Sequence, residues 1–89
     1  MSLKNSTYAV LAVDDMPENL SLIVQGLRTI GIKQKVYTAP NGKIGLDLAN
    51  RYLPDLIITD WEMPEMDGIE LTAKLKSGEN TQNIPVIMM

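Results

Sequence analysis

Residues 56–68 of the chain read LIITDWEMPEMDG, an apolar run that leads into an aspartate and then into a segment containing proline and glycine. The four residues before Asp60 are apolar or β-branched, which is typical of a strand buried on both faces of a parallel sheet. Asp60 is then expected at the carboxyl edge of the sheet, where open α/β sheets bind ligands. Because aspartate is also a favoured turn residue, a purely local role for Asp60 is the competing interpretation.

A second apolar run, residues 8–13, also ends in acidic residues, Asp14 and Asp15. Pro17 suits the first turn of a following helix, because its missing N–H would have no helical partner there. Gly31 is expected to end this helix. Its apolar residues recur at helical spacing, which predicts a buried stripe made of Leu20, Ile23, Val24 and Leu27.

The rest of the chain alternates in the same way. Residues 35–39 are more polar and predict a strand at the edge of the sheet. A helix is expected over residues 42–52 with Asn41 as its N-cap. Its predicted buried stripe consists of Ile44, Leu48, Ala49 and Tyr52.

 After the segment that follows Asp60, a further helix is expected to begin at Asp67 as N-cap and to end near Ser77. A fourth apolar run occupies residues 85–89 and predicts a fourth strand. In this interpretation the third helix carries Ile69, Leu71, Thr72 and Leu75.

The resulting order, βαβαβαβ, predicts a parallel sheet with helices on its faces, because strand–helix–strand crossovers are right-handed. With 89 residues the chain is at most one domain. Residues 1–7 are polar and are interpreted as a disordered N-terminal extension or a remnant of cloning, which leaves residues 8–89 as the domain.

Composition excludes several classes of function. The chain contains no cysteine and no histidine, which excludes disulfides, thiolate catalysis, histidine bases and Cys/His zinc sites. A net charge of −3 without a basic stripe argues against direct binding of nucleic acid. No apolar run reaches membrane-spanning length and no signal peptide is recognisable, so a cytoplasmic protein is expected.

The acidic residues that follow the first and third strands are interpreted here as one group. If the strands before Asp14 and Asp60 are neighbours, these two carboxylates and that of Asp15 converge at one edge of the sheet. Two unit charges about 4 Å apart repel by roughly 4 kcal/mol at an effective dielectric constant near 20. A divalent cation relieves this repulsion, and an all-oxygen ligand set suits Mg²⁺. The alternative is that some of these acids only cap helices.

With these motifs in place, the chain resembles the receiver domains of bacterial response regulators. The resemblance rests on Asp14 and Asp15 after the first strand, on Asp60 after the third, and on the continuation WEMPEMDG at residues 61–68. It covers nearly the whole chain. It implies a flavodoxin-like, doubly wound sheet with the strand order 2-1-3-4, of which the fifth strand and the last two helices are absent here.

The resemblance also implies a function, namely transfer of a phosphoryl group from a partner histidine kinase or phosphotransfer protein to Asp60. Asp15 and Asp60 would then bind Mg²⁺ directly, the backbone carbonyl of Glu62 would be a third ligand, and Asp14 would act mostly through a bound water. The domain would be a phosphoacceptor with slow autodephosphorylation rather than an enzyme. An effector domain is expected in a longer parent chain.

The chain departs from the family pattern at its end, where the hydroxyl residue expected after the fourth strand and the later lysine are not present. Two other classes of function therefore stay open. An aspartyl-phosphate hydrolase would need an aspartate two residues after Asp60, where this chain has Glu62. A receiver-fold interaction module that is not phosphorylated in this short form is the stronger alternative. The apolar fourth strand is expected to be an open edge and to favour self-association.

Overall fold

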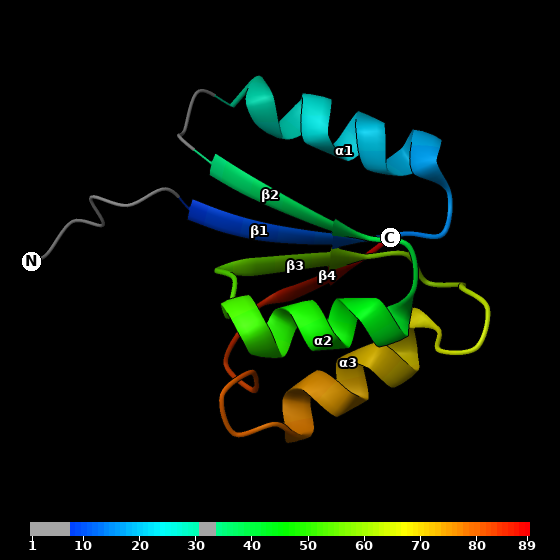
Figure 1. Ribbon diagram of the computed structural model, residues 1–89, viewed down its shortest axis with the longest axis vertical. Coiled ribbons are helices and arrows are strands. Elements are labelled where there is room, and N and C mark those ends of the chain that lie inside the picture. The colour runs from blue at the N-terminus through cyan, green and yellow to red at the C-terminus, as the bar shows by residue number, and fades with distance from the viewer. Residues whose placement is uncertain (1–7, 31–33) are drawn as a thin grey trace, which may run out of the picture.

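One parallel sheet organises residues 8–30 and 34–89, the part of the chain that the computed structural model describes. The strand order is β2-β1-β3-β4, which confirms the predicted order 2-1-3-4. Helix α1 lies on one face of the sheet, and α2 and α3 lie on the other (Figure 1). The elements in chain order are β1 (Tyr8–Val13), α1 (Pro17–Arg28), β2 (Gln34–Ala39), α2 (Gly42–Tyr52), β3 (Leu56–Thr59), α3 (Gly68–Ser77) and β4 (Val86–Met88).

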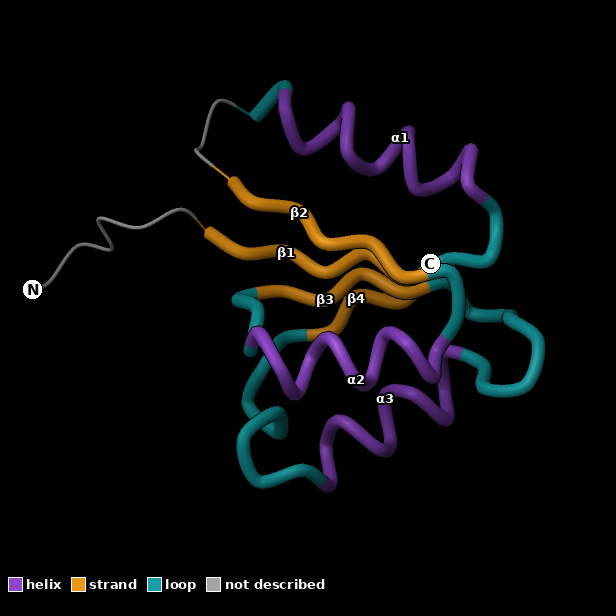
Figure 2. The backbone as a smooth tube through the Cα atoms, viewed as in Figure 1, coloured by secondary structure: helices purple, strands orange, loops and turns teal. Residues whose placement is uncertain are grey.

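The register of the strands aligns the ends of β1, β2 and β3. Val13, the last residue of β1, pairs with Ala39 of β2 and with Thr59 of β3. The segments that follow these three strands therefore leave the sheet at the same edge (Figure 2). Residues 1–7 and Gly31, for which the sequence predicts an extension and a helix end, lie outside the described residues.

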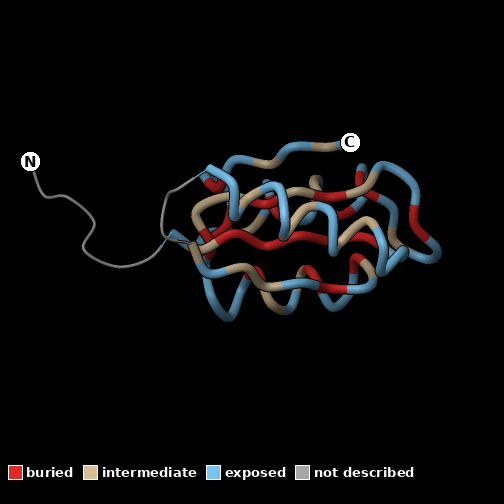
Figure 3. The backbone as a smooth tube through the Cα atoms, turned by 90° about the horizontal axis from the view of Figure 1, so that it is seen from above, coloured by how far each residue is buried: buried red, intermediate tan, exposed pale blue. Residues whose placement is uncertain are grey.

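The two faces of the sheet are buried to different extents. Side chains on the face toward α2 and α3 form the core, and Ile57 and Thr59 of β3 are fully buried there. Leu56 and Ile58 point to the other face and are only half-buried. The expectation that β3 is buried throughout is therefore wrong for these two residues, because α1 alone covers their face. Buried positions accordingly concentrate in the middle of the fold (Figure 3).

Helix α1 covers its face of the sheet incompletely. Its predicted stripe of four apolar residues faces the sheet, but each of the four is half-buried and no residue of α1 is fully buried. Pro17 occupies the start of the helix as predicted. No helix within residues 8–30 and 34–89 combines the length and apolar character needed to cross a membrane.

Helix α2 packs through two glycines and through part of the predicted stripe, because Ala49 is buried and Leu48 packs against the core. Gly42, Gly45 and Ala49 are its buried residues, whereas Ile44 and Tyr52 are exposed. The prediction is wrong for Ile44 and Tyr52 because the side of α2 that carries Gly42 and Gly45 faces the sheet and lies close to β1. A Cβ atom added at Gly45 would lie 2.8 Å from Cγ2 of Val13, which shows how little space remains.

Tyr52 instead packs at the rim of the sheet. Its ring stacks on that of Tyr37 with centroids 4.4 Å apart and an interplanar angle of 13°. The side chain keeps 45% of its surface exposed. Tyr52 thus shields the edge strand β2 rather than filling the core.

Both predicted N-caps are confirmed. The Asn41 side chain accepts a hydrogen bond from the backbone N–H of Ile44 at 2.8 Å, and that of Asp67 accepts one from Glu70 at 2.8 Å. Such caps satisfy backbone donors that the first turn of a helix leaves without partners. In α3, Leu71 and Leu75 are buried in the core, while Ile69 lies on the exposed side.

Candidate functional site

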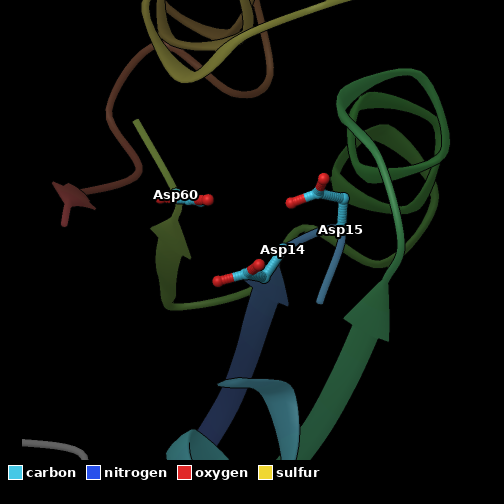
Figure 4. A group of neighbouring side chains, drawn as sticks. All are labelled: Asp14, Asp15 and Asp60. Carbon is cyan, nitrogen blue, oxygen red and sulfur yellow. The ribbon is translucent and has the colours of Figure 1, made fainter. Parts of the chain in front are cut away.

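Three acidic side chains meet at the carboxyl edge of the sheet. Asp14 and Asp15 follow β1, and Asp60 follows β3, which is the strand beside β1. One carboxylate oxygen from each residue lies within 4.8 Å of the others. The three side chains converge on the same space beyond the strand ends (Figure 4). The convergence that the sequence predicts is therefore present.

The backbone fixes where these carboxylates start. The N–H of Asp60 donates to the carbonyl of Val13 at 2.9 Å, and the N–H of Asp14 donates to that of Ala39 at 3.1 Å. Each bond continues the strand pairing by one residue beyond the sheet. The two aspartates are consequently held on rigid strand ends rather than on a loose loop.

Asp14 is the anchored member of the group. Its side chain is 2% exposed, accepts a hydrogen bond from the backbone N–H of Met16 at 2.9 Å, and accepts another from Nδ2 of Asn19 at 3.1 Å. Burial of a carboxylate is costly unless such donors satisfy it. These bonds occupy both oxygens of Asp14, which limits their availability for direct contact with an ion.

Asn19 is a site residue that the sequence interpretation missed. It lies in the first turn of α1, whose start follows the acidic pair directly. An amide at that point can reach back to the end of β1, and this position beside the acids is the signal that could have identified it. Asn19 also lines a hollow of about 380 Å³ together with Asp14, Asp60, Leu22, Ile23 and Met89.

Asp15 and Asp60 have free carboxylates. Asp15 is exposed and Asp60 is half-buried. Within residues 8–30 and 34–89, no donor is hydrogen-bonded to either carboxylate, and no lysine or arginine forms an ion pair with the three acids. The cluster thus carries like charges at short range, which is electrostatically unfavourable without a cation.

The segment from Trp61 to Asp67 connects Asp60 to the start of α3. Met63 of this segment is buried in the core, and Glu65 adopts a left-handed backbone conformation with φ of 68°. Trp61 and Glu62, the two residues that follow Asp60, are exposed. The Glu62 carboxylate is not part of the acidic cluster, and the role of the Glu62 backbone carbonyl as a ligand stays a prediction.

The donor set fits Mg²⁺. All the ligand atoms that converge here are carboxylate oxygens, and hard oxygen ligands in small number suit a cation that keeps several of its waters. Asp15 and Asp60 each offer an oxygen that no other group among the described residues occupies, while Asp14 contributes charge from a fixed position. The chemistry of these carboxylates therefore suits a divalent cation.

Comparison with known proteins agrees with this geometry. Residues 10–89 match the family model described as response regulator receiver domain. A probable cyclic di-GMP phosphodiesterase of Vibrio cholerae is 36% identical over 90 residues, which cover 100% of this chain and 20% of that protein. The chain thus spans one fifth of the length of that relative.

Solved structures give the same result. The N-terminal domain of a response regulator receiver protein from Methanoculleus marisnigri superposes with a TM-score of 0.84 at 36% identity, covering 93% of this chain and 66% of that one. The receiver domain of the sensor histidine kinase PA1611 from Pseudomonas aeruginosa, whose structure has a magnesium ion coordinated in its active-site cleft, superposes with a TM-score of 0.84 at 29% identity. It covers 93% of this chain and 66% of that one.

Proposed function

We propose, from the premise that the chain belongs to the family of response regulator receiver domains, that Asp60 accepts a phosphoryl group from a phosphohistidine of a partner protein. The observation that carries this proposal is the convergence of the Asp60 carboxylate with those of Asp14 and Asp15 at the sheet edge. Receiver domains are signalling domains of two-component systems, and this role is consistent with a half-buried acceptor that a donor can reach.

In the proposed transfer, a carboxylate oxygen of Asp60 attacks the phosphorus atom of the donor. The new O–P bond forms as the P–N bond to the donor imidazole breaks, and the imidazole nitrogen leaves with the electron pair of that bond. Slow autodephosphorylation is the attack of water on the same phosphorus, which returns the Asp60 carboxylate and releases inorganic phosphate. A carboxylate is a weak nucleophile, so the protein contributes mainly by positioning groups and balancing charge.

The residues that would hold Mg²⁺ are Asp15 and Asp60 directly, the backbone carbonyl of Glu62, and Asp14 mostly through water. When bound, Mg²⁺ neutralises charge on the oxygens of the transferring group. Asn19 and the N–H of Met16 keep the Asp14 carboxylate in place. Asp14 therefore adds negative charge without having to move when an ion binds.

The test is incubation of the chain with acetyl phosphate and Mg²⁺, followed by mass spectrometry. We expect one added phosphoryl group, located on the peptide that contains Asp60, and we expect none when a chelator removes the Mg²⁺. Addition at another residue, or equal addition with and without Mg²⁺, would contradict the proposal.

A second measurement addresses the metal alone. Because Trp61 is exposed directly after Asp60, its fluorescence is expected to change as millimolar Mg²⁺ is added. Asp15→Ala should remove this response, whereas Asp47→Ala, which deletes an exposed carboxylate paired with Arg51 on α2, should preserve it. A response that persists in Asp15→Ala counts against Asp15 as a ligand.

The wider context of the domain follows from the same proposal. The partner is a sensor histidine kinase or a phosphotransfer protein, and the effector domain is part of a longer parent chain. We propose that the domain acts in the cytoplasm. We expect this segment neither to contact a membrane nor to bind nucleic acid directly. The aspartyl-phosphate hydrolase alternative is disfavoured by Glu62, which stands where a second aspartate would be needed.

The second candidate is a protein-interaction module, and the edge strand β4 favours it. The carbonyl of Pro85 accepts from the N–H of Ile57, and Met89 exchanges bonds with Thr59 and Trp61. Because alternate residues of a parallel strand bond to the same neighbour, Val86 and Met88 direct their backbone groups away from β3. Within the described residues β4 has a strand neighbour on one side only.

We therefore propose that the 89-residue chain self-associates through β4, with Val86 of one copy paired to Met88 of the other in antiparallel fashion. Light scattering at micromolar concentration should show a dimer. Met88→Pro removes an outward N–H, which an edge strand tolerates, and should yield a folded monomer. A wild-type chain that is itself a folded monomer would refute this association.

A further inference from the structure

Two glycines bear on the segment that carries the proposed phosphoacceptor. Gly68 is the first residue of α3, and a Cβ atom added there would overlap the backbone oxygen of Asp60 and lie 3.2 Å from its carbonyl carbon. Gly42 is the first residue of α2, and a Cβ atom there would lie 2.7 Å from the backbone oxygen of Met66. Both obstacles are backbone atoms, so a flexible side chain cannot move aside to relieve them.

The segment between these contacts is fixed at several further points. The N–H of Gly68 donates to the carbonyl of Trp61 at 2.9 Å, and the N–H of Met66 donates to that of Pro64 at 2.7 Å. Met63 is buried in the core between them. A displacement at either glycine is therefore transmitted along the short backbone path to Asp60 and Glu62.

We propose that Gly68 and Gly42 are positioning residues of the site. Their missing side chains let the starts of α3 and α2 lie directly against the backbone of residues 60–66, and this contact sets where Asp60 and the Glu62 carbonyl stand relative to Asp14 and Asp15. The inference rests on the proposed function, because it concerns the geometry of the proposed Mg²⁺ ligands. Mg²⁺ requires nearly ideal octahedral geometry, so a displacement of a few tenths of an ångström already weakens binding.

The test is the Mg²⁺ dissociation constant of alanine variants, measured from the amide NMR signals of residues 14–16. These signals report the ion without relying on Trp61, whose backbone contacts Gly68. Gly68→Ala and Gly42→Ala are each expected to raise the dissociation constant by about 10- to 100-fold, the range typical of lost support around metal ligands.

Two other glycines provide matched controls. A Cβ atom at Gly26 in α1 meets nothing within 4 Å, and one at Gly78, the residue after α3, meets the side chain of Thr81. Gly26→Ala tests the substitution in open space. Gly78→Ala tests a loss of stability at the end of α3 remote from the site. Both are expected to keep the wild-type dissociation constant.

Each outcome decides the proposal. Unchanged Mg²⁺ binding in Gly68→Ala and Gly42→Ala would overturn the role of the glycines while leaving the proposed function intact. If wild type itself does not bind Mg²⁺, the proposed function fails as well. If one variant does not fold, the other decides. If neither folds, or if Gly78→Ala weakens binding equally, the glycines serve stability rather than position and the proposal is wrong.

Discussion

Replacing Asp60 with asparagine is expected to abolish phosphoryl acceptance and, without Mg²⁺, to raise the free energy of unfolding. The amide offers no anionic oxygen as a nucleophile, so transfer stops at this position. The same change removes one of three carboxylates that lie within 4.8 Å of one another. Because Asp15 is exposed and Asp60 half-buried, solvent screens the repulsion, and we expect a gain of about 1 kcal/mol.

The sign of this effect should reverse when Mg²⁺ is added. A ligand that binds only the folded state raises the free energy of unfolding. Once the ligand concentration exceeds the dissociation constant, this gain grows with the logarithm of the ratio of the two. Wild type should gain this stabilisation and Asp60→Asn should lose most of it. Urea denaturation of both proteins, with and without Mg²⁺, measures the reversal, and Asp47→Asn is the control for loss of an exposed carboxylate. Equal stability of wild type and Asp60→Asn under both conditions would show that the three acids do not act as one site.

The convergence of the acidic residues was predictable because they follow directly after the ends of strands. Asp14 and Asp60 each follow an apolar run in the sequence, and parallel strands place their carboxyl ends at one edge. Once β1 and β3 are neighbours, the convergence of the acids follows from the chain itself. The strand order 2-1-3-4 was implied by the resemblance to receiver domains. The two N-caps, Asn41 and Asp67, were predictable because their side chains can accept a hydrogen bond at the start of a helix.

The parts that sequence reasoning missed depend on packing at the level of individual side chains. The periodicity of α2 is compatible with a stripe through Ile44 or with one through Gly45, and only the close approach to Val13 selects the glycine side. The bond from Asn19 to Asp14 likewise depends on the direction in which α1 leaves the sheet. Apolar spacing identifies a helix and its approximate face, but it does not determine how deeply that face is buried.

The final prediction compares a buried leucine of α3 with an exposed leucine of α1. Leu71 of α3 is 0% exposed within the core, whereas Leu22 of α1 is 65% exposed. Truncating a buried leucine removes its transfer free energy and leaves a cavity, so Leu71→Ala is expected to lower the free energy of unfolding by about 2–5 kcal/mol. Leu22→Ala should change it by no more than about 0.5 kcal/mol.

The difference matters because small domains have a total stability of only about 5–15 kcal/mol. Leu71→Ala is therefore expected to leave a chain that is close to unfolding at physiological temperature, while Leu22→Ala remains folded. Urea denaturation of wild type and the two variants measures these changes directly, with the same dependence of the free energy of unfolding on urea concentration expected for all three proteins. Similar losses for Leu71→Ala and Leu22→Ala would mean that Leu22 is buried in solution as deeply as Leu71, which contradicts the exposed position of Leu22 in this structure.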